Sequence, residues 1–331
     1  MVKERIHWID VSKGILILLL LLHHFASAKR VMGIDSNFFS FLTCWQSLYT
    51  AFFMQAFLMM SGYCSNFKKP HGQFWEGVIK QLVIPFIFFE FISCCIISAQ
   101  KEDFSINGIF QVWIDTNGTT LWFLNALIVS KVLIYYMRRV TKSVKVALMI
   151  TFVLLVGAYA MNEFDVGTNF FCIRQSLGSV FFVYLGVLLK ERKEYFDRII
   201  RLGYIYPYVL VLLLFFKLPI PSSTANMVSL KMVPLFIPLS ICGSMAFFSL
   251  CKLINHSRFF EYFGRDSLIV YGVHFQLLCF SIHITLQHIT VNSYLQGMIA
   301  SVIIYTALIV ACSFFIELFK RPPAKWFVGR F

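Results

Sequence analysis

Residues 13–24 read KGILILLLLLHH, and this stretch decides the fold class. After Lys13 and Gly14 come eight consecutive Ile and Leu residues and then two histidines, His23 and His24. The apolar run around this stretch covers about 14–32, close to the roughly 20 residues that a helix needs to cross a bilayer core. It lacks a small-residue cleavage site and leads into further apolar runs, so we interpret it as a transmembrane helix and not as a signal peptide.

Apolar runs of similar length recur along the whole chain of 331 residues, ten in all. Hydrophobic residues make up 59% of the chain and charged residues only 14%, against roughly 45–50% and 25% in soluble domains. A soluble protein of this size could not bury so much apolar surface. The predicted spans lie near 14–32, 38–64, 82–100, 119–137, 144–161, 176–190, 202–218, 231–251, 267–286 and 292–319.

These runs predict an all-α, polytopic transmembrane bundle with about ten spans. We expect residues 5–320 to form one membrane-embedded domain and residues 321–331 to form a short basic cytoplasmic tail. The expected location is multi-pass in the cell (inner, cytoplasmic) membrane, with the lipid bilayer as its surroundings.

The distribution of cations predicts the orientation. With the N-terminus in the cytoplasm, the segments on that side carry 22 Lys and Arg residues and the opposite loops carry 6. This bias follows the positive-inside rule and places both termini in the cytoplasm. It also accounts for the net charge of +13. The cations form short clusters between apolar runs, so we expect no nucleic-acid partner.

Polar residues within spans are costly and are therefore the candidate functional groups. Lys13 and His24 are eleven residues apart, which is about three helical turns and roughly 16 Å along one helix face. His23 is rotated about 100° away from that face. Asp10 can pair with Lys13 at the i,i+3 spacing, or it can be an exposed acid that favours the helix start. His24 can be a functional imidazole or a structural histidine bonded to a neighbouring helix.

Two further intramembrane groups are candidates. His274 lies a few turns into the ninth predicted span, and it can either take part in the chemistry or brace a helix. Glu90, in the third span, can orient a histidine or stay protonated. We interpret Lys131, in the fourth span, as a side chain that reaches the membrane surface.

No metal is expected. None of the nine cysteines forms a CxxC pair, and most lie within apolar runs. The histidines predicted to be cytoplasmic, His7, His71 and His256, lack metal-ligand spacing in the sequence.

Five motifs in order resemble the acyltransferase-3 family, bacterial membrane enzymes that O-acylate sugars and other surface molecules. The resemblance covers about residues 5–320. Two features depart from the family pattern: Lys13 stands where Arg is commoner, and a frequent Arg-x-x-Arg before the third helix is reduced to Lys80. The motifs are Lys13 with His24, flanked by Asp10 and Gly14; FFMQAFLMMSGY at 52–63; LWFLNALIV at 121–129; SVFFVYLGVLL at 179–189; and GRDSLIVYGVHF at 264–275.

The resemblance implies acyl transfer from cytoplasmic acyl-CoA, by family habit acetyl-CoA, to a hydroxyl of a glycan or lipid-linked sugar. Such a transfer needs a base, cations for the CoA phosphates and donors for the oxyanion. His24 fits the base, Lys13 and Lys80 fit the phosphates, and Asp10 supports Lys13. His274 and Glu90 are weaker catalytic candidates.

Two other functional classes fit the composition. A transporter or flippase for a lipid-linked sugar also has many spans with buried polar groups, but we find no paired Gly/Pro-interrupted spans or half-to-half symmetry. A purely structural membrane subunit would not need a histidine three turns beneath a cation.

The topology can be tested with reporter fusions. Both termini and the loops at 138–145 and 190–201 should report from the cytoplasm, whereas the loops at 101–118 and 161–175 should report from the outside. A cytoplasmic signal from a fusion at residue 110 would contradict the ten-span interpretation.

Overall fold

The computed structural model describes residues 6–32, 46, 48–101, 104–116, 121–167, 169–222, 226–286 and 293–329. Within these residues every regular element is a helix, which confirms the all-helical prediction. The elements are α1 (His7–Met32), α3 (Phe53–Cys64), α4 (His71–Val78), the π-helix η1 (Ile79–Val83), α5 (Ile84–Gln100), α6 (Ile106–Thr116), α7 (Trp122–Val140), α8 (Val144–Glu163), η3 (Phe170–Cys172), α9 (Ile173–Glu191), α10 (Lys193–Ile199), η4 (Ile200–Tyr204), α11 (Ile205–Phe215), η5 (Leu230–Met232), α12 (Val233–Ile254), α13 (Arg258–Arg265), α14 (Ser267–Leu286), α15 (Tyr294–Phe319) and α16 (Ala324–Phe327).

Among the described residues, seven helical stretches are long and apolar enough to cross a membrane. The other three predicted spans overlap α3, α7 and α14. As described, α3 has 12 residues, and α7 carries Lys131 and ends on Arg138 and Arg139. The chain is thus a helical protein with several potential membrane spans, while ten crossings and the orientation stay predictions. The seven stretches are His7–Ala26, His71–Gln100, Val144–Glu163, Phe170–Glu191, Lys193–Phe215, Leu230–Ile254 and Tyr294–Phe319.

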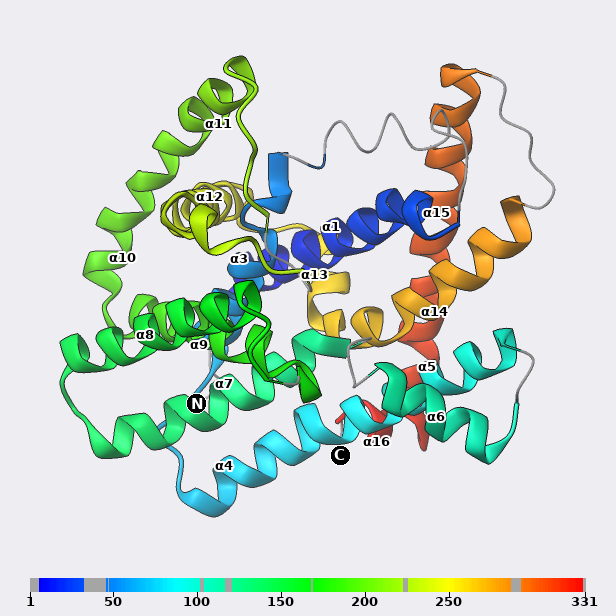
Figure 1. Ribbon diagram of the computed structural model, residues 1–331, viewed down its shortest axis with the longest axis horizontal. Coiled ribbons are helices and arrows are strands. Elements are labelled where there is room, and N and C mark those ends of the chain that lie inside the picture. The colour runs from blue at the N-terminus through cyan, green and yellow to red at the C-terminus, as the bar shows by residue number, and fades with distance from the viewer. Residues whose placement is uncertain are drawn as a thin grey trace.

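Helix α1 runs through the middle of the molecule (Figure 1) and packs against α3, α12, α13 and α14. Helix α9 forms a second centre, because it packs against α3, α7 and α8. The peripheral helices α8, α11 and α15 expose large apolar side chains such as Val153, Phe215 and Val310. In water these side chains would be unfavourable, so these faces suit contact with lipid.

Glycine pairs bring two helix crossings into backbone contact. At the α1–α13 crossing, a Cβ on Gly14 would lie 1.9 Å from the carbonyl oxygen of Phe260, and one on Gly264 would lie 1.8 Å from that of Asp10. Only a residue without a Cβ fits such a position. Small residues at helix contacts are typical of membrane proteins, in which helices associate by close van der Waals packing.

The α3–α9 crossing has the same reciprocal arrangement. A Cβ on Gly62 would lie 1.9 Å from the carbonyl oxygen of Val183, and one on Gly186 would lie 1.8 Å from that of Met59. Gly14, Gly62, Gly186 and Gly264 all belong to the motifs quoted above. These motifs therefore contain the residues that allow the central helices to approach closely.

Residues 321–329 of the predicted tail pack against the rest of the chain. Helix α16 packs against α5 and α15, and the ring of Phe327 stacks on Phe88 with centroids 4.6 Å apart. Val328 and Gly329 then line the large cavity described below.

The α1–α13 crossing predicts a stability effect. In Gly264→Ala the added methyl group would meet backbone atoms of Asp10 and Gly14, which cannot rotate away. We expect the free energy of unfolding to fall by about 1–3 kcal/mol, as for other overpacked sites. Denaturant or thermal unfolding in detergent measures this change. Gly157→Ala in α8 is the control, because nothing lies within 4 Å of a Cβ there. Equal stabilities for the two variants would contradict this account of the crossing.

Candidate active site

The first part of the candidate site is the start of α1. Lys13 Nζ lies 3.4 Å from Asp10 Oδ1, so the two residues form the i,i+3 ion pair that their spacing allows. Asp10 is 8% exposed. Its carbonyl oxygen is the atom that Gly264 approaches at the α1–α13 crossing. The crossing therefore fixes the position of this ion pair relative to α13.

Lys13 lines a cavity of about 570 Å³ formed by residues of α1, α3, α4, η1, α7 and the start of α14. This volume is within the range of small-molecule and cofactor sites. Four cations line it and one carboxylate, Asp266, accompanies them. Asp266 is buried and lies 3.7 Å from Lys320, measured from Oδ2 to Nζ. The cavity is thus basic and suited to an anionic ligand. The four cations are Lys13, Lys69, Lys131 and Arg265.

The sequence did not point to three of these cations. The sequence favours a surface-reaching side chain for Lys131, although a lysine within an apolar span is by itself a functional signal. Lys69 lies in the loop before α4 and Arg265 at the end of α13, where cations are common, and no pattern in the sequence distinguishes them.

Lys80 is not brought to this cavity. It lies on η1, and its Nζ is 2.6 Å from Oε1 of Glu76, both side chains being largely exposed. Lys80 is not among the residues that line the cavity. Its predicted contact with CoA phosphates therefore has no support in the geometry.

The second part of the site is a pair of histidines from α1 and α14. The rings of His24 and His274 lie 4.9 Å apart between centroids, at 46° to one another. The ring of His23 lies against Phe53 on α3, with centroids 5.2 Å apart. His24 is half-buried and His274 is 2% exposed. The structure thus brings together the two histidines that the sequence singled out separately.

The hydrogen bonding of His274 fixes its tautomer. Its Nδ1 lies 2.6 Å from the carbonyl oxygen of Tyr271, and a carbonyl can only accept, so Nδ1 carries the hydrogen. Nε2 is then an acceptor. It is buried and has no hydrogen-bond partner among the described residues. A buried acceptor without a partner costs free energy and is expected where a ligand or a proton is handled.

An aromatic cluster that lines the cavity contacts the histidine pair through Tyr271. Phe57, Phe123 and Tyr271 line the cavity. The centroid of Phe123 lies 5.2 Å from that of Phe57 and 5.6 Å from that of Tyr271. The backbone N–H of Phe123 donates to the Tyr271 hydroxyl at 3.2 Å. The ring of Tyr271 also lies 5.4 Å from that of His274, so the inner end of the cavity is one helical turn from the histidine pair.

Glu90, the third intramembrane candidate, is buried on α5. It is close enough to Tyr271 and Cys172 for a charge on it to act on both.

The family model described as an acyltransferase domain matches residues 6–318. The chain belongs to the acyltransferase-3 family. It is therefore a multi-pass membrane acyltransferase, as the motifs suggested. No curated protein and no solved structure matched the chain.

The different surroundings of the two neighbouring histidines give a prediction. His24→Ala should lower the rate of acyl transfer by roughly 10²–10⁴-fold, the usual contribution of a general base. His23→Ala should lower it far less, because the His23 ring lies against Phe53. The measurement is transfer of label from acyl-CoA in membranes with equal amounts of inserted protein. An inactive His23→Ala beside an active His24→Ala would overturn the assignment of the base.

Proposed function

We propose that this acyltransferase takes its acyl group from acyl-CoA, most simply acetyl-CoA, bound in the basic cavity, and transfers it to a hydroxyl of a cell-surface or exported glycan. The observation that carries the proposal is the order of the parts. A cavity lined by four cations includes Tyr271, which lies one helical turn before His274, the buried member of the histidine pair.

The cavity fits the donor in charge and in the mixed polarity of its lining. CoA carries several phosphates, and Lys or Arg side chains bind phosphate through charge-assisted hydrogen bonds. Lys13 and Arg265 belong to the two helices of the α1–α13 crossing, and Lys69 and Lys131 lie on other segments that line the cavity. The mixed lining, with apolar side chains such as Leu124 and Leu127, suits the less polar arm of such a donor.

The histidine pair fits the proton transfer. The hydroxyl oxygen of the acceptor attacks the thioester carbon, a C–O bond forms and the C–S bond breaks. His24 takes the hydroxyl proton and returns it to the departing CoA thiolate. His274 acts as a positioning residue in this scheme. Its ring lies 4.9 Å from that of His24 between centroids, and its Nε2 has no hydrogen-bond partner among the described residues, so it is free to accept a hydrogen bond from His24 when that ring is charged. The pair thus provides a base and an acceptor that stabilises the charged base.

Membership of an acyltransferase family favours this proposal over a transporter or flippase for a lipid-linked sugar. The two functions differ in one product. An acyltransferase moves label from acyl-CoA into the glycan, whereas a flippase moves the sugar without acylating it.

Lys13 provides the sharpest test of the donor site. If Lys13 holds a CoA phosphate, Lys13→Ala should weaken binding of the donor in the transition state by about 1.5–3 kcal/mol, as for hydrogen bonds to charged groups. The corresponding decrease in kcat/KM is roughly ten- to a hundred-fold, mainly through a higher KM for acyl-CoA. Lys13→Arg should keep most of the activity, because Arg also binds phosphate. In Lys80→Ala the decrease in kcat/KM should be much smaller, since Lys80 does not line the cavity.

The comparison of two donors separates phosphate binding from chemistry. With an acyl-pantetheine, which lacks the nucleotide phosphates, the defect of Lys13→Ala should shrink. Both donors are assayed on the wild type and the variants in nanodiscs. An equal loss with the two donors would mean that Lys13 serves the chemistry or the fold, and its phosphate role would be dropped.

A further inference from the structure

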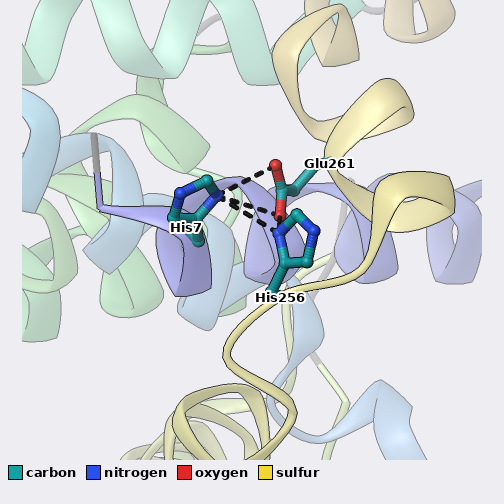
Figure 2. Close-up of side chains that lie close together, drawn as sticks. All are labelled: His7, His256 and Glu261. Carbon is teal, nitrogen blue, oxygen red and sulfur yellow. Dashed lines mark hydrogen bonds and ion pairs between the residues drawn. The ribbon is translucent and has the colours of Figure 1, made fainter.

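Three side chains from separate parts of the chain meet beside the start of α1 (Figure 2): His7 from α1, His256 from the turn before α13, and Glu261 from α13. Nδ1 of His7 lies 3.2 Å from each carboxylate oxygen of Glu261. Nδ1 of His256 lies 2.5 Å from Oε1 of Glu261 and 3.4 Å from Nδ1 of His7. Two imidazole nitrogens and one carboxylate therefore point at a common space.

The distances resemble the edges of a metal-coordination tetrahedron. Ligands bound to zinc at about 2.0–2.2 Å with tetrahedral angles lie roughly 3.3–3.6 Å from one another. The separations that involve His7, 3.2 and 3.4 Å, are close to this range. The shorter distance between His256 and Glu261 would need to lengthen by about 1 Å on this geometry. The exposed side chain of His256 can rotate by that much.

The donor groups also suit a cation. The side chain of Glu261 is 7% exposed and lies within hydrogen-bond distance of His7, His256 and the backbone N–H of Ser257. Neutral imidazole with carboxylate is a common donor set for zinc.

We propose that His7, His256 and Glu261 form a site for a first-row transition-metal ion such as Zn²⁺, with two Nδ1 ligands, one carboxylate ligand and water in the fourth position. The site goes beyond the proposed acyl transfer and does not depend on it. It also revises the expectation that the chain binds no metal, since His7 and His256 are 249 residues apart and show no ligand spacing in the sequence.

The place of the site in the fold indicates a structural role. A metal ion there would join the first turn of α1 to the beginning of α13, next to the glycine crossing of these two helices. His7 precedes Lys13 by six residues, and Glu261 precedes Arg265 by four, so both metal-bearing helices also supply the cavity with cations. The ion would therefore stabilise the wall of the cavity at a distance from the reacting atoms.

The alternative is a hydrogen-bonded triad without metal, in which both Nδ1–H groups donate to Glu261.

The test uses the full chain in detergent, purified without a histidine tag and stripped with a chelator. Zn²⁺ or Co²⁺ is added, excess ion is removed, and bound metal is measured by mass spectrometry. We expect one equivalent per chain and, with Co²⁺, the visible absorption of a four-coordinate site. Mg²⁺ should not compete, because it prefers six oxygen ligands.

Variants decide which residues bind the ion. His7→Gln and His256→Gln change side chains that are 44% and 55% exposed, so both variants should fold. Each should lower the affinity for Zn²⁺ at least tenfold and abolish the Co²⁺ spectrum. His71→Gln is the matched control: His71 is exposed on α4 and contacts Tyr136, and its variant should bind like the wild type.

The thermal midpoint provides a second measurement. Added Zn²⁺ should raise it in the wild type and in His71→Gln, because a ligand that binds only the folded state stabilises that state. Added Zn²⁺ should not raise the thermal midpoint of His7→Gln. Folded wild-type protein that takes up no Zn²⁺ would overturn the proposal, and so would unchanged uptake by both His7→Gln and His256→Gln.

Discussion

The backbone contact between α1 and α13 is the constraint on which the candidate site depends. Gly14 and Gly264 lie against carbonyl oxygens of the opposite helix, where a Cβ would come within 2 Å of the oxygen. The contact fixes Lys13 and Arg265, which both line the cavity, relative to each other. The α3–α9 crossing repeats the arrangement and holds α3, which also lines the cavity. In a membrane, where the hydrophobic effect between helices is weak, such close packing supplies much of the association energy.

Two helices carry the candidate groups in the same order. Helix α1 carries Lys13 at the cavity and His24 three turns further along, and α14 carries Tyr271 at the cavity and His274 one turn beyond it. Helices are rigid on this scale, so the separation between the cationic cavity and the histidines is set by residue spacing. The unpartnered Nε2 of His274 costs about 1–3 kcal/mol, a cost that functional groups within membrane proteins commonly carry.

The sequence predicted what a single helix determines. The ten apolar runs all overlap helices, and the Asp10–Lys13 pair and the different directions of His23 and His24 follow from 3.6 residues per turn. Features that depend on how helices pack could not be predicted. The spacing within the chain does not show that His274 meets His24, or that Lys131 faces a cavity. For the same reason the sequence does not show that Lys80 lies outside the cavity, or that His7 and His256 lie side by side.

The aromatic cluster connects the cavity with the reaction it is proposed to serve. A thioester in the cavity could be lost to water unless water is kept from the base, and exclusion of water also strengthens electrostatic interactions around the reacting atoms. Phe57, Phe123 and Tyr271 line the cavity and contact one another, the Phe123 N–H donates to the Tyr271 hydroxyl, and the Tyr271 ring contacts His274. In the proposed reaction these rings would limit the size of the acyl group that reaches the histidines, and the cations would select the donor by its phosphates. The two specificities would then reside in different residues.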